Sequence, residues 1–561
     1  MPSRLPAGSR RYDSPCPVRR PVSPGCGSRP SSEQGPRKRP IHLLRETGAT
    51  HTQAAHLGAR SGHRLRTTGG TPEEGETHLS PSDDTTVLLI NPPDLAAVGR
   101  REGRILSYLT AVRRGRMMPP LGLCSLAAVL RKAGVPVSIL DADALNLTIE
   151  QVGEHVRQVK PTIVGVTTTT IALNAAYQVC KAVRRIDEDI LIVLGGPQVS
   201  VMPAETADHP AVDVAVSGEG EPTILSLVEA GGDRAAWPAI PGLAYRENGR
   251  IVRTGPGRRV KNVNALPLPA RDLVPLDRYY DRTTTHERAM SILTARGCPY
   301  RCLFCEREVV GHGFRPFDPM RVVDEMQEIV GRYGFREVVI YDDTFTANIR
   351  HATIICEEIL RRGLRFPWDC RTRVDRVTPK LLRLMKRAGC QRISYGIESA
   401  NPRILKILRK GITPAQAVQA VRWTRQAGIR SLAYFMLGSP GETRETIEQT
   451  IRFSLRLGAD FAYYSMTVPW PGSDMWTRAV AEGLVDADYW AEYVRNEGTL
   501  TRPLPVFADT PSYRRFIEAS VSRAYRAYYL RPAFIVNRIL SLRSPRDVAW
   551  QAKLAAALVR M

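Results

Sequence analysis

The sequence contains no apolar run that approaches the roughly 18–20 residues needed to span a bilayer, which excludes a membrane-spanning helix. It also lacks a hydrophobic signal core after the basic residues near the N-terminus, so we expect a soluble, cytoplasmic protein. Cysteine is scarce, with 10 residues among 561, and this excludes a fold held together by disulfides. Apolar and charged residues stand at 43 % and 24 %, which excludes a wholly disordered chain.

Length and charge narrow the class of protein further. A chain of 561 residues exceeds what a single hydrophobic core serves, so about two or three domains are expected. The formal net charge of +23 is compatible with a polyanionic partner such as RNA, with a membrane surface, or with an arginine-rich genome. A charge surplus alone governs solubility and non-specific attraction rather than function. We therefore do not expect a nucleic acid as partner.

Residues 1–84 differ in composition from the rest of the chain. They are rich in Pro, Gly, Ser, Arg and Thr and show neither helical nor alternating periodicity. Segments of this kind cannot bury enough apolar surface to offset the entropy of ordering. We expect a disordered and dispensable tail, or a start codon upstream of the true one, and we assign Cys16 and Cys26 no role.

Residues 85–232 alternate short apolar runs with amphipathic stretches. Such runs are typical of strands buried on both faces, and the helices between them supply the crossovers of a parallel sheet. The pattern predicts an α/β domain with a doubly wound parallel sheet. The five expected strands are Val87–Ile90, Val137–Leu140, Ile163–Val166, Ile190–Leu194 and Val212–Val216.

A linker over residues 233–283, with a small sheet-like stretch from Gly242 to Val252, leads to a second α/β series over residues 284–500. Six strand–helix repeats in about 200 residues favour a partial (β/α)6 barrel over a full eight-fold barrel. The expected strands are Ser291–Thr294, Glu337–Tyr341, Trp368–Thr372, Arg392–Gly396, Ser431–Leu437 and Phe461–Thr467.

Residues 501–561 are expected to form a helical appendage that closes the open side of this barrel. The helical interpretation rests on apolar residues that recur at a spacing of three or four. These residues are Tyr513, Phe516, Ile517, Val521 and Tyr525.

Three cysteines fall on one short segment, Arg296-Gly-Cys298-Pro-Tyr-Arg-Cys302-Leu-Phe-Cys305, after the first strand of the second series. Three thiolates at this spacing can wrap one face of a four-iron cubane and leave one iron without a protein ligand. An open coordination position is typical of a site of chemistry, whereas a structural metal site closes its shell. The alternative is a zinc knuckle that borrows a fourth ligand such as His312, although zinc sites seldom use this spacing.

This segment resembles the signature of radical S-adenosylmethionine (SAM) enzymes. The domain before it resembles the cobalamin-binding domain of the subgroup that contains anaerobic magnesium-protoporphyrin monomethyl ester cyclase and hopanoid-modifying enzymes, and the likeness spans about Thr86 to Leu530. It implies a [4Fe–4S] cluster held by Cys298, Cys302 and Cys305, whose open iron chelates SAM. It also implies reductive cleavage of SAM to a 5′-deoxyadenosyl radical that takes a hydrogen atom from the substrate. The protein supplies orientation and a dry site for this chemistry.

The resemblance places SAM at the ends of the second series of strands, where a barrel holds its site residues. Asp342 or Asp343 is then the acceptor for the methionine amino group, although an Asp that caps the next helix explains this pair equally well. Arg371 and Arg373 end the third strand, where a guanidinium can clamp the methionine carboxylate through two hydrogen bonds.

Two later motifs extend the implied SAM site. Glu398, followed by Ser399, ends the fourth strand and is placed to accept hydrogen bonds from the ribose, with a surface carboxylate as the alternative. Gly438 and Gly441 end the fifth strand, where glycine permits close approach of the backbone to adenosine. A tight strand-to-helix turn needs the same two residues. The segment Pro469–Gly472 resembles a family loop near adenine, but a Trp beside two prolines is more often a packing residue.

Cobalamin binding is implied without a histidine ligand. Many cobalamin domains carry Asp-x-His-x-x-Gly, whose histidine is the lower ligand of cobalt, and here His155 and His209 stand in other contexts. The resembled subgroup commonly lacks this histidine. Open α/β sheets bind ligands outside the carboxyl ends of their strands, and the alternative is a relic domain that binds nothing. The expected cradle consists of Thr167, Thr168, Gly195, Gly196, Pro197, Gln198, Gly218 and Glu219.

Two reactions compete if cobalamin is present: methyl transfer to a substrate radical, and oxidation or cyclisation as in the cyclase. RNA methylthiolation normally requires an N-terminal domain with three cluster-binding cysteines, whereas the folded region before Cys298 has only Cys124 and Cys180. A non-catalytic cobalamin-binding module leaves the three-cysteine loop unexplained. We expect a small or lipophilic substrate and, because no second cluster domain is evident, an external electron donor such as flavodoxin or ferredoxin.

Overall fold

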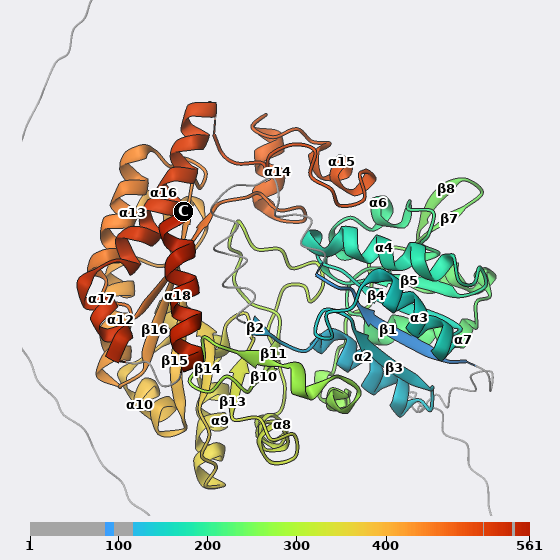
Figure 1. Ribbon diagram of the computed structural model, residues 1–561, viewed down its shortest axis with the longest axis horizontal. Helices are drawn as coiled ribbons and strands as arrows, with labels where there is room; N and C mark the ends of the chain where they lie inside the picture. The colour runs from blue at the N-terminus through green and yellow to red at the C-terminus, as the bar shows by residue number, and fades with distance from the viewer. Residues whose placement is uncertain (1–84, 95–115, 509, 541–544, 561) are drawn as a thin grey trace, which may run out of the picture. The chain divides into compact units, whose positions relative to one another are not determined.

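The computed structural model describes residues 85–94, 116–508, 510–540 and 545–560 (Figure 1). The tail expected over residues 1–84 lies outside the described residues. The described chain contains two large sheets whose strands are mainly parallel. Helices connect successive parallel strands in each sheet, as the apolar periodicity predicts. The predicted α/β fold class is therefore confirmed. In the described part of the chain, no helix is both long and apolar enough to cross a membrane.

The first sheet has the strand order β3-β1-β4-β5-β6-β7-β8, in which the first five strands run parallel. These five match the predicted positions, because each is an apolar run that helices cover on both faces. Helices α2 and α7 pack on one face and α3 and α4 on the other, which makes the sheet doubly wound. The strands are β1 (Val87–Asn91), β3 (Val137–Asp141), β4 (Ile163–Thr167), β5 (Leu191–Gly195) and β6 (Val214–Val216). The helices are α2 (Leu121–Lys132), α3 (Ile149–Val159), α4 (Leu173–Arg184), α5 (Pro197–Val201), α6 (Pro203–Ala207) and α7 (Gly220–Ala230).

The first sheet extends past residue 232, where we expected its domain to end. The hairpin β7 (Leu243–Glu247) and β8 (Arg250–Arg253) adds two antiparallel strands to the edge at β6. Leu243, Ala244 and Tyr245 are buried, so this part of the presumed linker belongs to the core of the first sheet. The boundary was misplaced because, after its first three residues, the hairpin has only Ile251 and Val252 as apolar residues, and its composition resembles that of a linker.

The second sheet is fully parallel, in the order β10-β13-β14-β15-β16-β17, and matches the predicted partial barrel. A side-chain cap at the N-terminus of α8, α9, α10, α12 and α13 satisfies backbone N–H groups that a helix start leaves open. The strands are β10 (Ala289–Ile292), β13 (Glu337–Ile340), β14 (Trp368–Thr372), β15 (Cys390–Glu398), β16 (Arg430–Leu437) and β17 (Phe461–Met466). The helices are α8 (Pro319–Gly331), α9 (Ile349–Arg361), α10 (Pro379–Arg387), α11 (Pro402–Ile407), α12 (Pro414–Gln426) and α13 (Arg444–Arg456).

Short paired strands connect these parts. Strand β2 (Arg116–Met117) pairs with β9 (Tyr280–Asp281), and β11 (Ala295–Arg296) pairs with β12 (Arg315–Pro316), both antiparallel. The second pair closes the base of the segment 297–314, which carries the three clustered cysteines and is called the cysteine loop below. Because Arg296 lies opposite Arg315, the two ends of the cysteine loop are held together.

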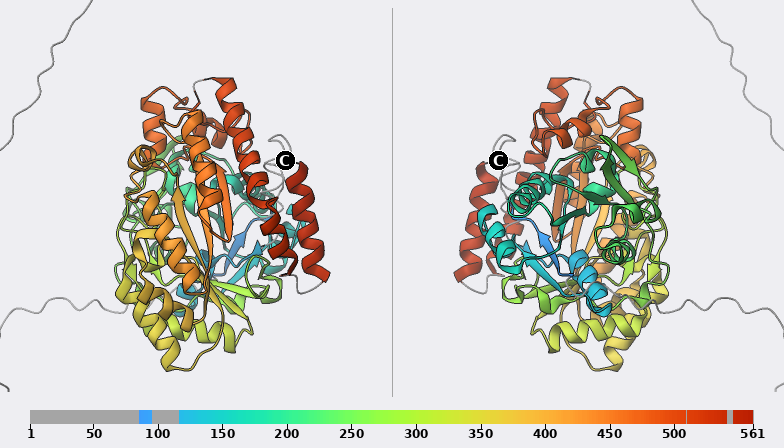
Figure 2. Two further views of the ribbon diagram at one scale, coloured as in Figure 1. Left: turned by 90° about the vertical axis from the view of Figure 1, so that its left-hand side faces the viewer. Right: turned by 90° about the vertical axis from the view of Figure 1, so that its right-hand side faces the viewer.

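Helix α16 covers the edge strand β17, and α17 and α18 pack against α16, as expected of the C-terminal appendage (Figure 2). The hydroxyl of Tyr525 accepts from Tyr464 N–H and donates to Tyr464 O, and Tyr529 makes the same pair of bonds with Ala462. The two tyrosine hydroxyls thus pair backbone groups of β17 that have no neighbouring strand. Without them this edge of the sheet would be open. The helices are α14 (Asp474–Ala481), α15 (Tyr489–Arg495), α16 (Pro511–Tyr529), α17 (Pro532–Leu540) and α18 (Pro545–Arg560).

Glu337, at the start of β13, is a buried carboxyl group at the end of the second sheet remote from the cysteine loop. Burial, with a further contribution from Asp369, raises its pKa from an ordinary value of 4.5 to about 7, although the N–H of His286 bonds to it. The folded state therefore holds a proton that the unfolded chain releases. Stability from this group is present below about pH 4.5 and is lost as the pH rises to about 7.

Replacement Glu337→Gln should remove this pH dependence. At about 1.4 kcal/mol per pKa unit, the parent protein should lose up to about 3 kcal/mol between pH 5 and pH 7.5 that the variant keeps. Chemical denaturation of both proteins at a series of pH values measures the difference. Parallel curves for the two proteins would contradict the assignment.

Candidate functional site

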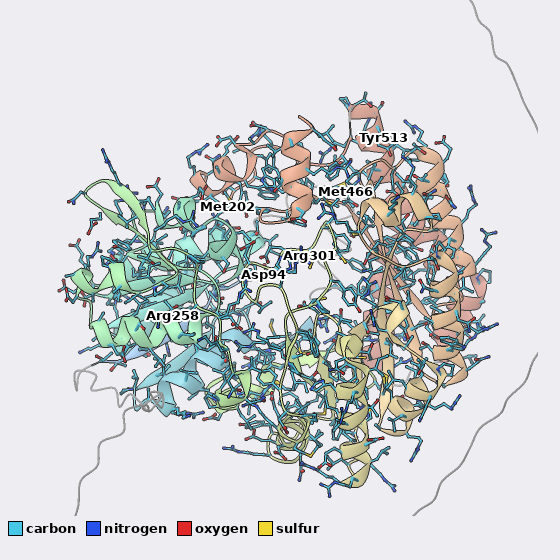
Figure 3. All side chains as sticks on the ribbon, turned by 180° about the vertical axis from the view of Figure 1, so that it is seen from behind. Asp94, Met202, Arg258, Arg301, Met466 and Tyr513 are labelled. Carbon is cyan, nitrogen blue, oxygen red and sulfur yellow. The ribbon has the colours of Figure 1, made fainter. Side chains whose placement is uncertain are left out.

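The cysteine loop presents its three cysteines between the carboxyl ends of the two sheets. Cys298 and Cys302 are buried and Cys305 is half-buried. In Figure 3, Arg301 of this loop lies between Asp94, which follows β1, and Met466, which ends β17. The three residues predicted to hold metal therefore lie on one loop, and their role stays a prediction.

Several contacts fix the loop in this position. Gly297 has φ of 81°, and a Cβ there would lie 2.5 Å from Gly313 O, so only glycine fits this turn. Leu303 N donates to Leu408 O at 3.0 Å, and Met475 N donates to Leu303 O at 2.9 Å. The backbone of the loop is therefore bonded to the residue that follows α11 and to the first turn of α14.

The cysteine loop supplies three thiols as possible metal ligands. Among the described residues, no three His, Cys, Asp or Glu side chains converge as ligands of one metal ion. In a cubane each thiolate binds a different iron, so its ligands stand further apart than those of one zinc ion. His312, the fourth ligand of the zinc alternative, is exposed, although its backbone is bridged to that of Cys298. The donor set of three thiols on one loop suits a [4Fe–4S] cluster.

Two of the thiols have neighbours that affect their hydrogen bonding or their pKa. Cys298 Sγ lies 3.6 Å from the buried hydroxyl of Thr344, which follows β13. Burial, reinforced by the charge of Asp343, raises the pKa of Cys305 to about 12. A thiol of this kind keeps its proton unless a metal replaces it.

A cavity of about 540 Å³ lies at the carboxyl ends of the first sheet, beside the cysteine loop. It opens at β1 and β4, where the order of strands reverses, which is the usual ligand site of a doubly wound sheet. Arg296 and Gly297 of the second series form part of its wall, as do Tyr341 and Asp343. Six predicted cradle residues line it: Thr167, Gly195, Gly196, Pro197, Gly218 and Glu219.

The two central glycines of this cradle play different roles. A Cβ on Gly195 would meet only Val216 O at 3.9 Å, so the space in front of Gly195 is open. Gly196 has φ of 103°, and its Cβ would lie 2.7 Å from Thr168 O. Gly196 therefore permits close packing of the loops after β4 and β5, whereas Gly195 leaves room for a ligand.

The other two predicted cradle residues stand behind the cavity wall. Thr168 is buried, its N–H donates to Gly195 O and its hydroxyl bonds to Thr169 O. The side-chain amide of Gln198 is fully buried, and neither of its polar atoms has a hydrogen-bond partner among the described residues. Such an unpartnered amide is costly unless a ligand satisfies it.

The predicted aspartates separate into two environments. Asp342 is buried and accepts from Thr294 N–H at 2.6 Å and from Ala295 N–H, and burial raises its pKa to about 7. Its oxygens thus join the ends of β10 and β13. Asp343 is exposed and lines the cavity. Neither caps the next helix, because Asn348 caps α9.

The predicted arginines also differ. The guanidinium of Arg371 lies over the ring of Tyr341, 4.2 Å from its centroid. Arg373 is buried, forms two bonds to Asp375 and one to Lys410 O, and lies 3.9 Å from the ring centroid of Tyr300 in the cysteine loop. Its Nη1 has no partner among the described residues, which leaves one buried donor for a ligand.

Glu398 forms a buried ion pair that the sequence did not predict. Its carboxylate lies 2.8 Å from Lys410 Nζ, and its φ of 67° is strained for a residue other than glycine. Lys410 Nζ also lies 5.5 Å from the ring centroid of Phe304 in the cysteine loop. Ser399 instead bonds to Thr450 of α13. The sequence around Lys410 carries no signal for this pair, because the burial of Lys410 and its contact with Glu398 depend on the fold.

The glycine motif after β16 forms a tight turn. A Cβ on Gly438 would lie 2.9 Å from Ile517 of α16, and one on Gly441 would lie 2.9 Å from Ile407. The N–H groups of Gly438 and Ser439 donate to Glu442, whose pKa burial raises to about 7. These glycines adjoin packed side chains, so the turn interpretation has direct structural support.

The loop Pro469–Gly472 is a packing segment in this structure. Trp470 stacks on Trp490 of α15 with ring centroids 5.2 Å apart, and Trp490 Nε1 donates to Pro469 O. A Cβ on Gly472 would overlap Val201, which ends α5 of the first sheet. This loop therefore joins the ends of the two sheets.

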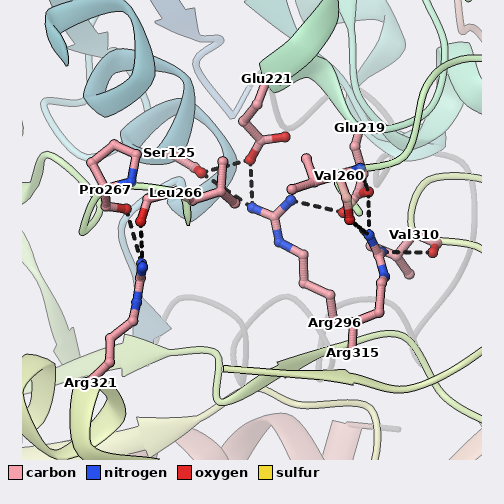
Figure 4. A network of polar contacts seen from close by, with 10 residues as sticks. All are labelled: Ser125, Glu219, Glu221, Val260, Leu266, Pro267, Arg296, Val310, Arg315 and Arg321. Carbon is pink, nitrogen blue, oxygen red and sulfur yellow. Dashed lines mark hydrogen bonds and ion pairs between the residues drawn. The ribbon is translucent and has the colours of Figure 1, made fainter. Parts of the chain in front are cut away.

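An ion-pair network at the cavity wall was also absent from the sequence prediction. Arg296 bonds to Glu219 at 2.8 Å and to Glu221 at 2.5 Å, and Arg315 bonds to Glu219 at 2.7 Å (Figure 4). Burial opposes ionisation of Glu221, yet its bond to Arg296 lowers its pKa. The paired acids in Gly218-Glu-Gly-Glu221 were the available signal, since two acids at a buried strand end require cationic partners.

Comparison with known proteins identifies the family. Residues 292–454 match the model of the radical SAM superfamily, and residues 109–228 match that of the B12 binding domain. An uncharacterized methyltransferase of Pyrococcus horikoshii is 34 % identical over 455 residues, which make up 81 % of this chain and 94 % of that protein. The chain belongs to the radical SAM superfamily. It is a radical SAM enzyme that carries a B12-binding domain, as the cysteine segment and the first sheet predicted.

Other relatives agree with this assignment. The anaerobic magnesium-protoporphyrin IX monomethyl ester cyclase of Cereibacter sphaeroides is 31 % identical over 362 residues, which make up 63 % of this radical SAM enzyme and 59 % of the cyclase. The radical SAM methyltransferase TsrM of Kitasatospora setae, with tryptophan and a SAM analogue bound, shares the fold with a TM-score of 0.64. That match covers 78 % of this chain and 88 % of TsrM at 22 % identity. Methyltransferases and a cyclase are thus among its relatives.

Replacement Gly196→Ala should destabilise the B12-binding domain, because alanine at φ of 103° is strained and its Cβ would meet Thr168 O. We expect a loss of about 1–3 kcal/mol. Gly195→Ala, next to it, should stay within about 0.5 kcal/mol of the parent because its Cβ meets open space. Urea denaturation followed by circular dichroism compares the two variants, and equal losses would refute the distinction.

Proposed function

We propose that this radical SAM enzyme binds a [4Fe–4S] cluster through Cys298, Cys302 and Cys305, SAM beside that cluster, and cobalamin in the cavity of the first sheet. The reaction is methyl transfer to a carbon atom of a small-molecule substrate. The observation that carries the proposal is a shared wall: Arg296 and Gly297, directly before Cys298, line the same cavity as Gly195 and Gly218. When bound, the cluster supplies the electron that cleaves SAM, and cobalamin supplies a methyl carrier.

The residues around the cysteine loop suit SAM. Asp343 is an exposed carboxylate at the cavity edge and can accept from the methionine ammonium group. Arg373 offers its unpartnered Nη1 to the methionine carboxylate while Asp375 holds the rest of the guanidinium. Glu398 and Lys410 place a carboxylate for the ribose and a cation beside Phe304 of the loop. Asp342 holds β10 and β13 together beneath them and contacts no ligand.

The cavity suits a cofactor that needs no histidine ligand. Its described lining contains no His, because His155 lies on α3 and His209 stacks on Tyr177 with ring centroids 4.0 Å apart. Open space in front of Gly195 supports a bound group at this sheet end. The lining is mainly apolar, through Leu89, Val193 and similar side chains, which excludes water from the reacting centre.

Methyl transfer is favoured over cyclisation by the coverage of the relatives. The methyltransferase of Pyrococcus horikoshii matches over 94 % of its length, whereas the cyclase matches over 59 %. An external reductase such as flavodoxin or ferredoxin supplies the electron, because the described chain has one cysteine loop of this type. The net charge of the whole sequence, +23, suits such acidic donors.

The cluster assignment is tested by replacing Cys298, Cys302 and Cys305 together by Ala. Protein reconstituted without oxygen should hold about four irons per chain, as one cubane requires, and the triple variant should hold none. Iron content, the absorption of the cluster and 5′-deoxyadenosine formed from SAM are the measurements. The matched control replaces the three buried cysteines Cys356, Cys370 and Cys390 by Ala and should retain the cluster. A cluster retained in the first variant would overturn the assignment.

Cobalamin binding is tested with Gly195→Val, which fills the space in front of the strand end. Hydroxocobalamin should stay with the parent protein through gel filtration and should be lost by at least tenfold in the variant. Gly331→Val, at the end of α8 with no atom near its Cβ, is the control and should bind as the parent does. The electron paramagnetic resonance spectrum of cob(II)alamin on the parent should show no splitting from a histidine nitrogen. Unchanged retention in Gly195→Val would place cobalamin elsewhere.

A further inference from the structure

The two acids that follow β6, Glu219 and Glu221, are called the carboxylate pair here. Both are buried, with 2 % and 6 % of their surface exposed. Their partners come from the second series: Arg296 bonds to both acids, and Arg315 bonds to both oxygens of Glu219 at 2.7 and 3.0 Å (Figure 4). The pair thus grips the two residues that close the base of the cysteine loop.

The chain between the two sheets reinforces this junction. Val260 N donates to Glu219 at 2.8 Å, and Val260 O accepts from Arg315 at 2.6 Å. Gly257 packs against the end of β6 so closely that a Cβ there would overlap Ser217 O. Ser125 of α2 donates to Glu221 at 2.7 Å. Both oxygens of Glu219 and one oxygen of Glu221 therefore accept hydrogen bonds, and the donors come from α2, from residue 260 and from the two ends of the cysteine loop.

The ion pairs between the carboxylate pair and the cysteine loop lie in the wall of the cavity. Glu219, Gly220 and Glu221 line it from the first sheet, and Arg296 and Gly297 line it from the cysteine loop. Any ligand that fills the cavity contacts both halves of the ion pairs. Cys298 is two residues from Arg296. The carboxylate pair therefore positions the first cluster ligand through a short piece of chain.

Resting on the proposed function, we propose that Glu219 and Glu221 are positioning residues: they hold the cysteine loop, and hence the cluster, at a fixed place relative to cobalamin in the first sheet. The pair touches no reacting atom. Its removal leaves each cofactor bound while their mutual placement becomes variable, because Arg296 and Arg315 lose the charges that orient them. A buried arginine without its carboxylate is also strongly disfavoured, which moves the base of the loop.

The test uses full-length protein loaded with cluster and hydroxocobalamin, reduced so that both the cluster and cob(II)alamin are paramagnetic. Pulsed electron paramagnetic resonance should give one narrow distribution of distances between the two centres in the parent. In Glu219→Gln and Glu221→Gln, iron and cobalamin content should stay within twofold of the parent while the distribution broadens at least twofold. Hydrogen exchange of residues 296–315 in protein free of both cofactors should speed up at least tenfold in the same variants.

The matched control is Asp369→Asn, which removes the partner of a buried arginine, Arg392, on the second sheet. It should leave the distance distribution narrow even where it lowers the melting temperature. Arg296→Lys keeps the charge but cannot bridge two carboxylates, and it should broaden the distribution as the Gln variants do. A narrow distribution in both Gln variants, or equal broadening in Asp369→Asn, overturns the proposal. A parent protein that retains no cobalamin refutes the proposed function, and a lack of faster exchange in the Gln variants then refutes the positioning role separately.

Discussion

The arrangement of the site depends on the ion pairs that Arg296 forms with Glu219 and Glu221. Arg296 is the last residue before the cysteine loop, and it is bonded to two buried acids that end the first sheet. A half-buried guanidinium and two buried carboxylates must be desolvated together, so they stay together only when both sheets are in place. Apolar contacts such as those of Trp490 and Tyr493 in the core of the first sheet also join the two parts, and both kinds of contact hold the carboxyl ends of the sheets beside one cavity. The three charged side chains bind the base of the cysteine loop directly to the first sheet.

Much of the fold was predictable because its signals are local. Strands such as Val87–Ile90 and Ile163–Val166 are buried on both faces and therefore read as continuous apolar runs. The hairpin of β7 and β8 was missed as part of the first sheet because only Leu243–Tyr245 is fully buried, while Ile251 and Val252 are half-buried and the other residues are exposed and polar. A change in composition along the sequence marks where burial ends. The hairpin has both buried and exposed residues, so it lies on both sides of that change. Sequence patterns therefore locate elements well and locate domain edges less well.

The candidate site was predictable only where a motif carries its own chemistry. Three cysteines on one loop can be recognised without knowing the fold, whereas a carboxylate at a strand end can face a ligand or an arginine. Glu219 illustrates the difference: it lines the cavity as expected, yet its oxygens are taken by Arg296 and Arg315, which lie 77 and 96 residues further along the chain. Lys410 escaped notice for the same reason, since its partner Glu398 is on another element. Contacts between distant residues are set by topology, and a single sequence does not state them.

The charges near the cysteine loop also explain why its polar residues divide into two groups. Asp342 and Glu219 are buried with both of their oxygens bonded to protein donors, so they hold backbone segments in place. Asp343 is exposed to the cavity, and Arg373 keeps one buried nitrogen without a partner among the described residues. An acid with all its oxygens bonded gains nothing from a ligand, whereas an unpartnered buried donor gains a hydrogen bond of about 1–3 kcal/mol when one arrives. Binding therefore falls to the second group, and the first group keeps the second in position before any ligand is present.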